Sequence, residues 1–157
     1  MELKDLTAKL GLKVLNKELV PDDEGRVALT VDGIPVTLQS FDEAGKLFTF
    51  GEVGDVPPEG VEMLAVEMLK ANYLYRATGG STLSLDEQTN KLYLIRYDDF
   101  DRLDYEAFEK MLENFVNVLV QWHEIVKGYH PDLSRKSHEP EETPDSQGLE
   151  KFMFLRV

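Results

Sequence analysis

The chain has 157 residues and carries 30 acidic against 17 basic side chains, so its formal net charge at pH 7 is −13. A field of this sign repels nucleic-acid phosphates and anionic lipid surfaces, so we expect neither nucleic acid nor membrane as a partner. The sequence contains no cysteine, which excludes disulfides and thiolate metal sites. No apolar run approaches the roughly 18 residues of a membrane span, and the first residues lack the pattern of a signal peptide. These features predict one cytoplasmic domain.

Apolar residues at helical spacing predict a short amphipathic helix over residues 2–12. Its apolar stripe consists of Leu3, Leu6 and Leu10, with charged residues between them. Gly11 stands near the expected end of this helix, where a glycine commonly adopts the left-handed cap conformation. We therefore expect the helix to end there.

Three strand-like runs follow, over residues 27–31, 34–39 and 46–50. Asp32 and Gly33 separate the first two runs and are typical of a two-residue hairpin turn. The apolar side chains of the runs are Val27, Leu29, Val31, Ile34, Val36, Leu38, Leu47, Phe48 and Phe50. The pattern predicts an antiparallel meander.

A second helix is predicted over residues 59–74, after two prolines that end the meander. Only Glu62, Glu67 and Lys70 clearly mark a hydrated face. The remaining apolar arc is wider than the stripe of a helix that packs on one core. We expect something beyond the domain's own sheet to cover this arc.

The rest of the chain predicts two strands over residues 82–85 and 92–97, then a long helix that Asp104 caps and Gly128 ends. The order α-β-β-β-α-β-β-α is typical of an α+β fold, with an antiparallel sheet flanked by helices. We expect one domain over residues 1–128. A polar, disordered linker over 129–148 and an apolar segment over 149–157 are expected to follow.

Motifs that carry chemistry are incomplete. His123-Glu124 matches the start of a zinc-protease motif, but the position of the second histidine holds Lys127. The glycine pair at 79–80 lacks the lysine of a phosphate loop, and neither acidic cluster has the spacing of a calcium loop. A catalytic pair of carboxylates for hydrolysis remains an open alternative, because the distance between two carboxylates is set by the fold. The sequence therefore nominates no catalytic residue, no metal ligand and no cofactor, and an enzyme is the least supported of the function classes.

Apolar residues exceed what one small core needs, in the first helix, the meander, the second helix and residues 149–157. For the second helix, core or dimer contact is the favoured interpretation. For the first helix and the meander, core packing and a peptide-binding groove both stay open. Apolar grooves on an acidic protein are typical of peptide-binding sites.

The stretch Met68-Leu69-Lys70-Ala71-Asn72-Tyr73-Leu74, continued by Thr78-Gly79-Gly80-Ser81-Thr82-Leu83-Ser84-Leu85-Asp86, resembles the segment that joins the second helix to the fourth strand in one known family. That family is the Tir-chaperone family of class I effector chaperones of type III secretion. The resemblance extends over residues 1–127 and includes the element order, the Leu-rich first helix and the region from Phe115 to Trp122. The extension after this region is longer than in many members and has no family role assigned to it.

The resemblance implies a homodimer that packs through the second helix and the fourth strand. The dimer-interface residues it implies are Met63, Val66, Met68, Leu69, Tyr73, Leu83 and Leu85. It also implies apolar grooves, built from the first helix and the sheet, that bind an N-terminal effector segment in extended form. The effector-binding residues it implies are Leu3, Leu6, Leu10, Val27, Leu29, Val36, Leu38, Phe48 and Phe50.

The function that follows from this resemblance is a chaperone that keeps a secreted effector soluble and competent for secretion, with release by the secretion ATPase. Such a chaperone needs no nucleotide of its own, in agreement with the incomplete phosphate loop. The alternative is an acidic binding module of the same fold that sequesters a regulatory protein.

Overall fold

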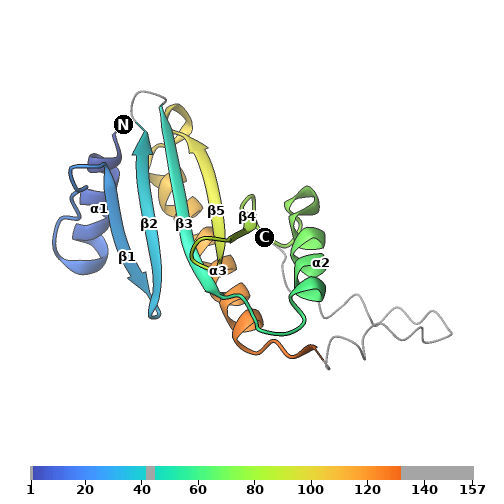
Figure 1. Cartoon of the computed structure of the whole chain (residues 1–157). Coiled ribbons are helices and arrows are strands. Elements are labelled where there is room, and N and C mark those ends of the chain that lie inside the picture. The colour runs from blue at the N-terminus through green and yellow to red at the C-terminus, as the bar shows by residue number, and fades with distance from the viewer. Residues whose placement is uncertain (1, 42–44, 132–157) are drawn as a thin grey trace.

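A five-stranded antiparallel sheet in the order β1-β2-β3-β5-β4 organises the protein, in a computed structural model that describes residues 2–41 and 45–131 (Figure 1). The elements are α1 (Leu3–Leu15), β1 (Arg26–Val31), β2 (Ile34–Phe41), β3 (Lys46–Asp55), α2 (Val61–Asn72), the 3₁₀ turn η2 (Tyr73–Tyr75), β4 (Thr82–Asp86), β5 (Lys91–Asp99), the 3₁₀ turn η3 (Phe100–Arg102) and α3 (Tyr105–Lys127). The predicted element order and fold class are confirmed.

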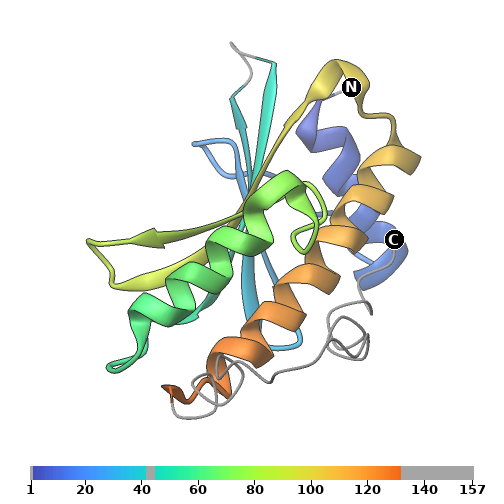
Figure 2. The ribbon, with the colours of Figure 1, turned by 90° about the vertical axis from the view of Figure 1, so that its right-hand side faces the viewer.

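The helices pack on one face of the sheet. α1 lies behind β1 and β2, and α2 runs beside α3 next to β4 (Figure 2). Alternation along β3 separates the two faces: Leu47 and Val53 point into the core, whereas Phe48 and Phe50 point to the opposite face and are half-buried. No described helix covers that opposite face.

α1 is longer than predicted, because Gly11 lies within the helix and does not end it. A Cβ atom at Gly11 would clash with the carbonyl oxygen of Lys17, so the glycine lets the chain fold back against the helix. The left-handed residue that ends α1 is Asn16, with a φ of 54°. The longer helix brings Leu12, Val14 and Leu15 onto its last turn.

β3 also extends beyond its predicted end at Phe50, to Asp55. Gly51 lies within the strand, and its position is set by packing. A Cβ atom there would clash with Cδ2 of Leu119, so only glycine lets α3 approach the sheet this closely. The register of the pairing between β3 and β5 shifts between Glu52 and Gly54. The two strands remain paired beyond this irregularity, to Asp55.

α3 begins and ends as predicted. The Asp104 carboxylate accepts a hydrogen bond from the N–H of Ala107 at 2.8 Å, and Gly128 follows the last helical residue. The linker is predicted to begin at residue 129. The Tyr129 hydroxyl donates to the Gly60 carbonyl at 2.8 Å, so the first residue of the predicted linker contacts the start of α2. The other residues of the predicted linker from 132, and the apolar segment 149–157, lie outside the described residues.

Candidate binding surfaces

His123, which resembles part of a metal-binding motif in the sequence, has a structural role in the described part of the fold. His123 Nδ1 lies 2.9 Å from the carbonyl oxygen of Val53, so this histidine joins α3 to β3. Across residues 2–41 and 45–131, no group of three or more His, Asp or Glu side chains is placed to hold a metal ion. The same residues contain no helix that is long and apolar enough to cross a membrane.

The nine predicted effector-binding residues do not form one surface. Six of them are core residues whose side chains are at most 8% exposed, namely Leu3, Leu6, Leu10, Val27, Val36 and Leu38. Leu29 is half-buried in β1, and Phe48 and Phe50 lie on the opposite face of the sheet. The accessible apolar surface of α1 is therefore provided by residues other than the three predicted leucines.

A groove of about 650 Å³ runs between α1 and α3. It is lined by Leu10, Lys13, Val14, Glu106, Glu109, Lys110, Leu112, Glu113, Val116 and Asn117. Leu10 and Leu112 are buried beneath it, whereas the side chain of Val14 is 66% exposed. The groove thus combines an apolar floor with a charged rim. The exposed Leu12 and Leu15 extend the apolar surface of α1.

An ion pair between Lys13 and Glu109 joins the two helices at this groove. The hydrogen bond between the two side chains raises the pKa of Lys13 above its ordinary value. The same bond lowers the pKa of the Glu109 carboxyl. The Tyr105 hydroxyl also donates to Glu109, at 3.3 Å. The ionised form of Glu109 is thus favoured by contacts with side chains of both helices.

The edge of the sheet at β1 is open over part of its length. The N–H of Ser40 donates to the Gly25 carbonyl at 3.0 Å. Because every second residue of an antiparallel strand bonds to its neighbour, the residues of β1 that bond to β2 are Val27, Leu29 and Val31. The N–H and C=O groups of Ala28 and Thr30 consequently point away from β2. Among the described residues, these groups have no backbone partner outside the strand.

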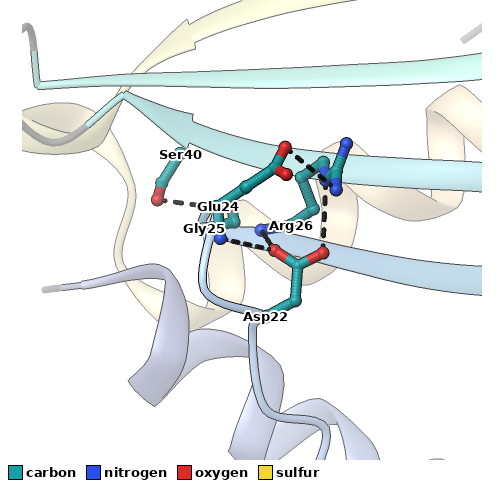
Figure 3. Close-up of polar contacts among 5 residues, drawn as sticks. All are labelled: Asp22, Glu24, Gly25, Arg26 and Ser40. Carbon is teal, nitrogen blue, oxygen red and sulfur yellow. Dashed lines mark hydrogen bonds and ion pairs between the residues drawn. The ribbon is translucent and has the colours of Figure 1, made fainter.

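At the start of β1 the outward groups are occupied (Figure 3). The N–H of Arg26 donates to Oδ1 of Asp22 at 2.9 Å, and the N–H of Asp22 donates to the Arg26 carbonyl at 2.8 Å. Ion pairs from the Arg26 guanidinium to Asp22 and Glu24 hold the same loop. Sequence reasoning treated residues 21–25 as a polar turn and missed this contact.

A second apolar surface lies on α2, η2 and β4. Its exposed side chains are Val66, Leu69, Tyr73, Leu74, Tyr75 and Leu85. Of the seven predicted dimer residues, Val66, Leu69, Tyr73 and Leu85 belong to this surface, Met63 is half-buried, and Met68 and Leu83 are buried. The structure thus brings four predicted residues together on one exposed face.

The turn η2 explains why this face is larger than the helix alone. α2 ends at Asn72, before its predicted end at residue 74. Leu74 and Tyr75 then both adopt a φ of 54°, a region that bulky residues seldom occupy. Their side chains are nevertheless exposed. The strained turn therefore adds apolar surface directly beside α2.

A smaller aromatic cluster lies on the uncovered face of the sheet. The ring of Phe48 contacts Phe41 and Tyr97 edge-to-face, with centroid separations of 5.0 Å and 4.8 Å. The Lys46 ammonium lies 5.0 Å from the centroid of Tyr97 and pairs with Asp99. Phe48 was a predicted binding residue, and its aromatic neighbours were not predicted.

The family model of the Tir chaperone protein (CesT) family matches residues 2–123. The chain belongs to this family. The match covers α1 to most of α3, so it includes the groove, the open β1 edge and the α2–β4 surface. No curated protein sequence is significantly similar to the chain.

Solved structures share the fold. The chain is similar to a protein in the crystal structure of the ExsC–ExsE complex, with 24% identity, a TM-score of 0.67, and coverage of 80% of this chain and 97% of that one. A chain of the HopA1–SchA chaperone–effector complex has 20% identity, a TM-score of 0.64, and coverage of 77% and 92%. A chain of the ExoU–SpcU complex from the type III secretion system of Pseudomonas aeruginosa has 15% identity, a TM-score of 0.63, and coverage of 81% and 99%.

Proposed function

We propose that the protein is a cytoplasmic, non-catalytic chaperone of class I that binds the N-terminal segment of a type III secretion effector in extended form. The observation that carries the proposal is the coexistence of an open strand edge at β1 and an apolar groove between α1 and α3. An extended segment gains main-chain hydrogen bonds at a strand edge and specificity from side-chain pockets. Family membership supports the same function.

The energetics require both parts of this site. Ala28 and Thr30 offer four outward backbone groups, and at a net 0.5–1.5 kcal/mol each these supply about 2–6 kcal/mol. Ordering a disordered segment costs about 2–5 kcal/mol, which consumes most of that gain. Apolar side chains of the cargo in the groove must therefore supply most of the affinity.

The exposed surface of α2, η2 and β4 has a different role in this proposal, as the contact between two copies of the chain. A two-fold contact buries the same apolar side chains from both copies. Leu69, Tyr73 and Leu74 are the most exposed of them, at 63–69%. A dimer of this acidic chain keeps the bound effector soluble, and the secretion ATPase is the expected partner for release.

Co-expression with the products of neighbouring genes tests the proposal. We expect one effector to co-purify in a stable complex of two chaperone chains with one effector segment, and limited proteolysis to leave a protected N-terminal fragment. Binding to a folded regulatory protein in place of an effector would instead support the alternative, a module that sequesters a regulator. Failure to bind either would contradict both functions.

A proline at the β1 edge tests the mode of binding. The N–H of Ala28 points away from β2, so Ala28→Pro removes an outward donor and leaves the ladder between β1 and β2 intact. We expect weaker effector binding with an unchanged fold, whereas the matched control Ala28→Ser keeps the N–H and binds normally. Equal binding by both variants would contradict strand addition at β1.

A further inference from the structure

The loop before β1 occupies the outward backbone groups at the first residue of the strand, Arg26. Both outward backbone groups of Arg26 are bonded to Asp22, one to its carboxylate and one to its N–H. The loop therefore pairs with β1 as a short strand would, and Figure 3 shows the Asp22 carboxylate directed at the start of the strand.

Further contacts hold Asp22 in this position. Its carboxylate also accepts from the N–H of Glu24 at 2.9 Å and from Nε of Arg26 at 3.2 Å. The N–H of Gly25 donates to the Asp22 carbonyl at 3.0 Å, and Gly25 is in turn bonded to Ser40 of β2. Gly25 has a φ of 72°, and a Cβ atom there would lie 2.8 Å from Ser40 Oγ. The loop is thus anchored to the sheet.

The opposite end of the open edge is also bounded. Asp32 and Gly33 have φ values of 51° and 81°, which turn the chain from β1 into β2. Between this turn and Arg26, the residues whose backbone groups point away from β2 are Ala28 and Thr30. We infer that Asp22 is a stop that confines the pairing of an incoming strand to Ala28 and Thr30.

This inference rests on the proposed function and adds a determinant of register to it. Because pairing is limited to two residues of β1, the partner is a short extended segment that must leave the sheet edge at Arg26. A register slip by two residues toward the loop would require the incoming strand to displace Asp22. The stop therefore selects one register among those that an unbounded edge would accept.

Amide hydrogen exchange of the full chain, measured by NMR, tests the stop without a partner. We expect slow exchange at Arg26 and fast exchange at Ala28 and Thr30. Asp22→Ala should accelerate exchange at Arg26 by roughly tenfold or more, because it removes the acceptor. The matched control Asp23→Ala removes the same charge from the same loop and should leave Arg26 slow. Equally fast exchange at Arg26 and Ala28 in the unaltered chain would overturn the inference.

The second measurement uses the protease-protected effector fragment from the co-purified complex as the probe. In the unaltered chain the fragment should slow exchange at Ala28 and Thr30 only. In the Asp22→Ala variant the slow region should extend to Arg26, which gives a longer footprint. A bound footprint that is the same in both chains would overturn the stop. A fragment that protects neither Ala28 nor Thr30 would contradict strand addition, while the first measurement still decides whether Asp22 closes the edge.

Discussion

Asn72 occupies the outer edge of β4 at one residue by pairing with Leu83. Its side-chain amide donates to the Leu83 carbonyl at 3.0 Å and accepts from the Leu83 N–H at 2.8 Å. A side chain at the end of α2 thereby occupies the groups that a neighbouring strand would use. Each edge of the sheet thus has one position that its own chain occupies, Leu83 on β4 and Arg26 on β1. Occupied backbone groups at an edge are protected against unwanted strand pairing.

Replacing Asn72 by alanine should destabilise the fold. Leu83 is 5% exposed, so its N–H and C=O groups would lose their partners in a buried place. We expect a loss of about 1–3 kcal/mol in the free energy of unfolding, measured by urea denaturation. The control Asn117→Ala changes an exposed asparagine of α3 and should stay within about 0.5 kcal/mol. Equal effects of the two substitutions would contradict the role of Asn72.

Local patterns predicted the elements well where local chemistry decides them. The positive φ values of Asp32 and Gly33 and the capping bond of Asp104 are consequences of short sequence motifs. The wide apolar arc of α2 correctly indicated surface in excess of the core. These features depend on residues that are close in the sequence.

Features that depend on tertiary contacts were not predictable in this way. Periodicity identified Leu3 as apolar but did not show that it packs in one cluster with residues of α3. The need for glycine at position 51 becomes clear only when Leu119 is placed against it. The pairing of Asp22 with Arg26 looks like an ordinary polar turn in the sequence. In each case the missing information was which distant element lies opposite.

Leu69→Glu should weaken the proposed dimer. The side chain is 69% exposed in the single chain, so the substitution leaves the core unchanged. A two-fold contact contains the substitution twice, which buries two charges and should raise the dissociation constant by roughly 100-fold or more. Sedimentation velocity measures the change. Val14→Asp, on the distant α1 surface, serves as the control and should remain dimeric. A Leu69→Glu dimer of unchanged strength would place the dimer contact elsewhere.

Val14→Asp should weaken effector binding at the groove between α1 and α3. Val14 lines this groove and is exposed, so unfolding free energy should change by no more than about 0.5 kcal/mol. An aspartate there places a charge beside the apolar floor, and we expect a loss of roughly tenfold or more in affinity, measured by calorimetry with the protected fragment. Ile125→Asp alters an exposed apolar residue of α3 outside the groove and should bind normally. Normal binding by Val14→Asp would exclude the groove as the effector site.

The ion pair of Lys13 and Glu109 should make the contact between α1 and α3 depend on pH at both extremes. The pKa of Glu109 is lowered by its bond to Lys13, so its contribution is present above the ordinary glutamate pKa and is lost as the pH falls through the lowered value. The pKa of Lys13 is raised, so its contribution is present below the ordinary lysine pKa and is lost as the pH rises through the raised value. An NMR titration of the Glu109 carboxyl should therefore give a midpoint below the ordinary value. Lys13→Met should return that midpoint toward the ordinary value. The control Lys4→Met, on the same helix, should leave the midpoint unchanged. A midpoint that does not move in the Lys13→Met variant would contradict the pairing.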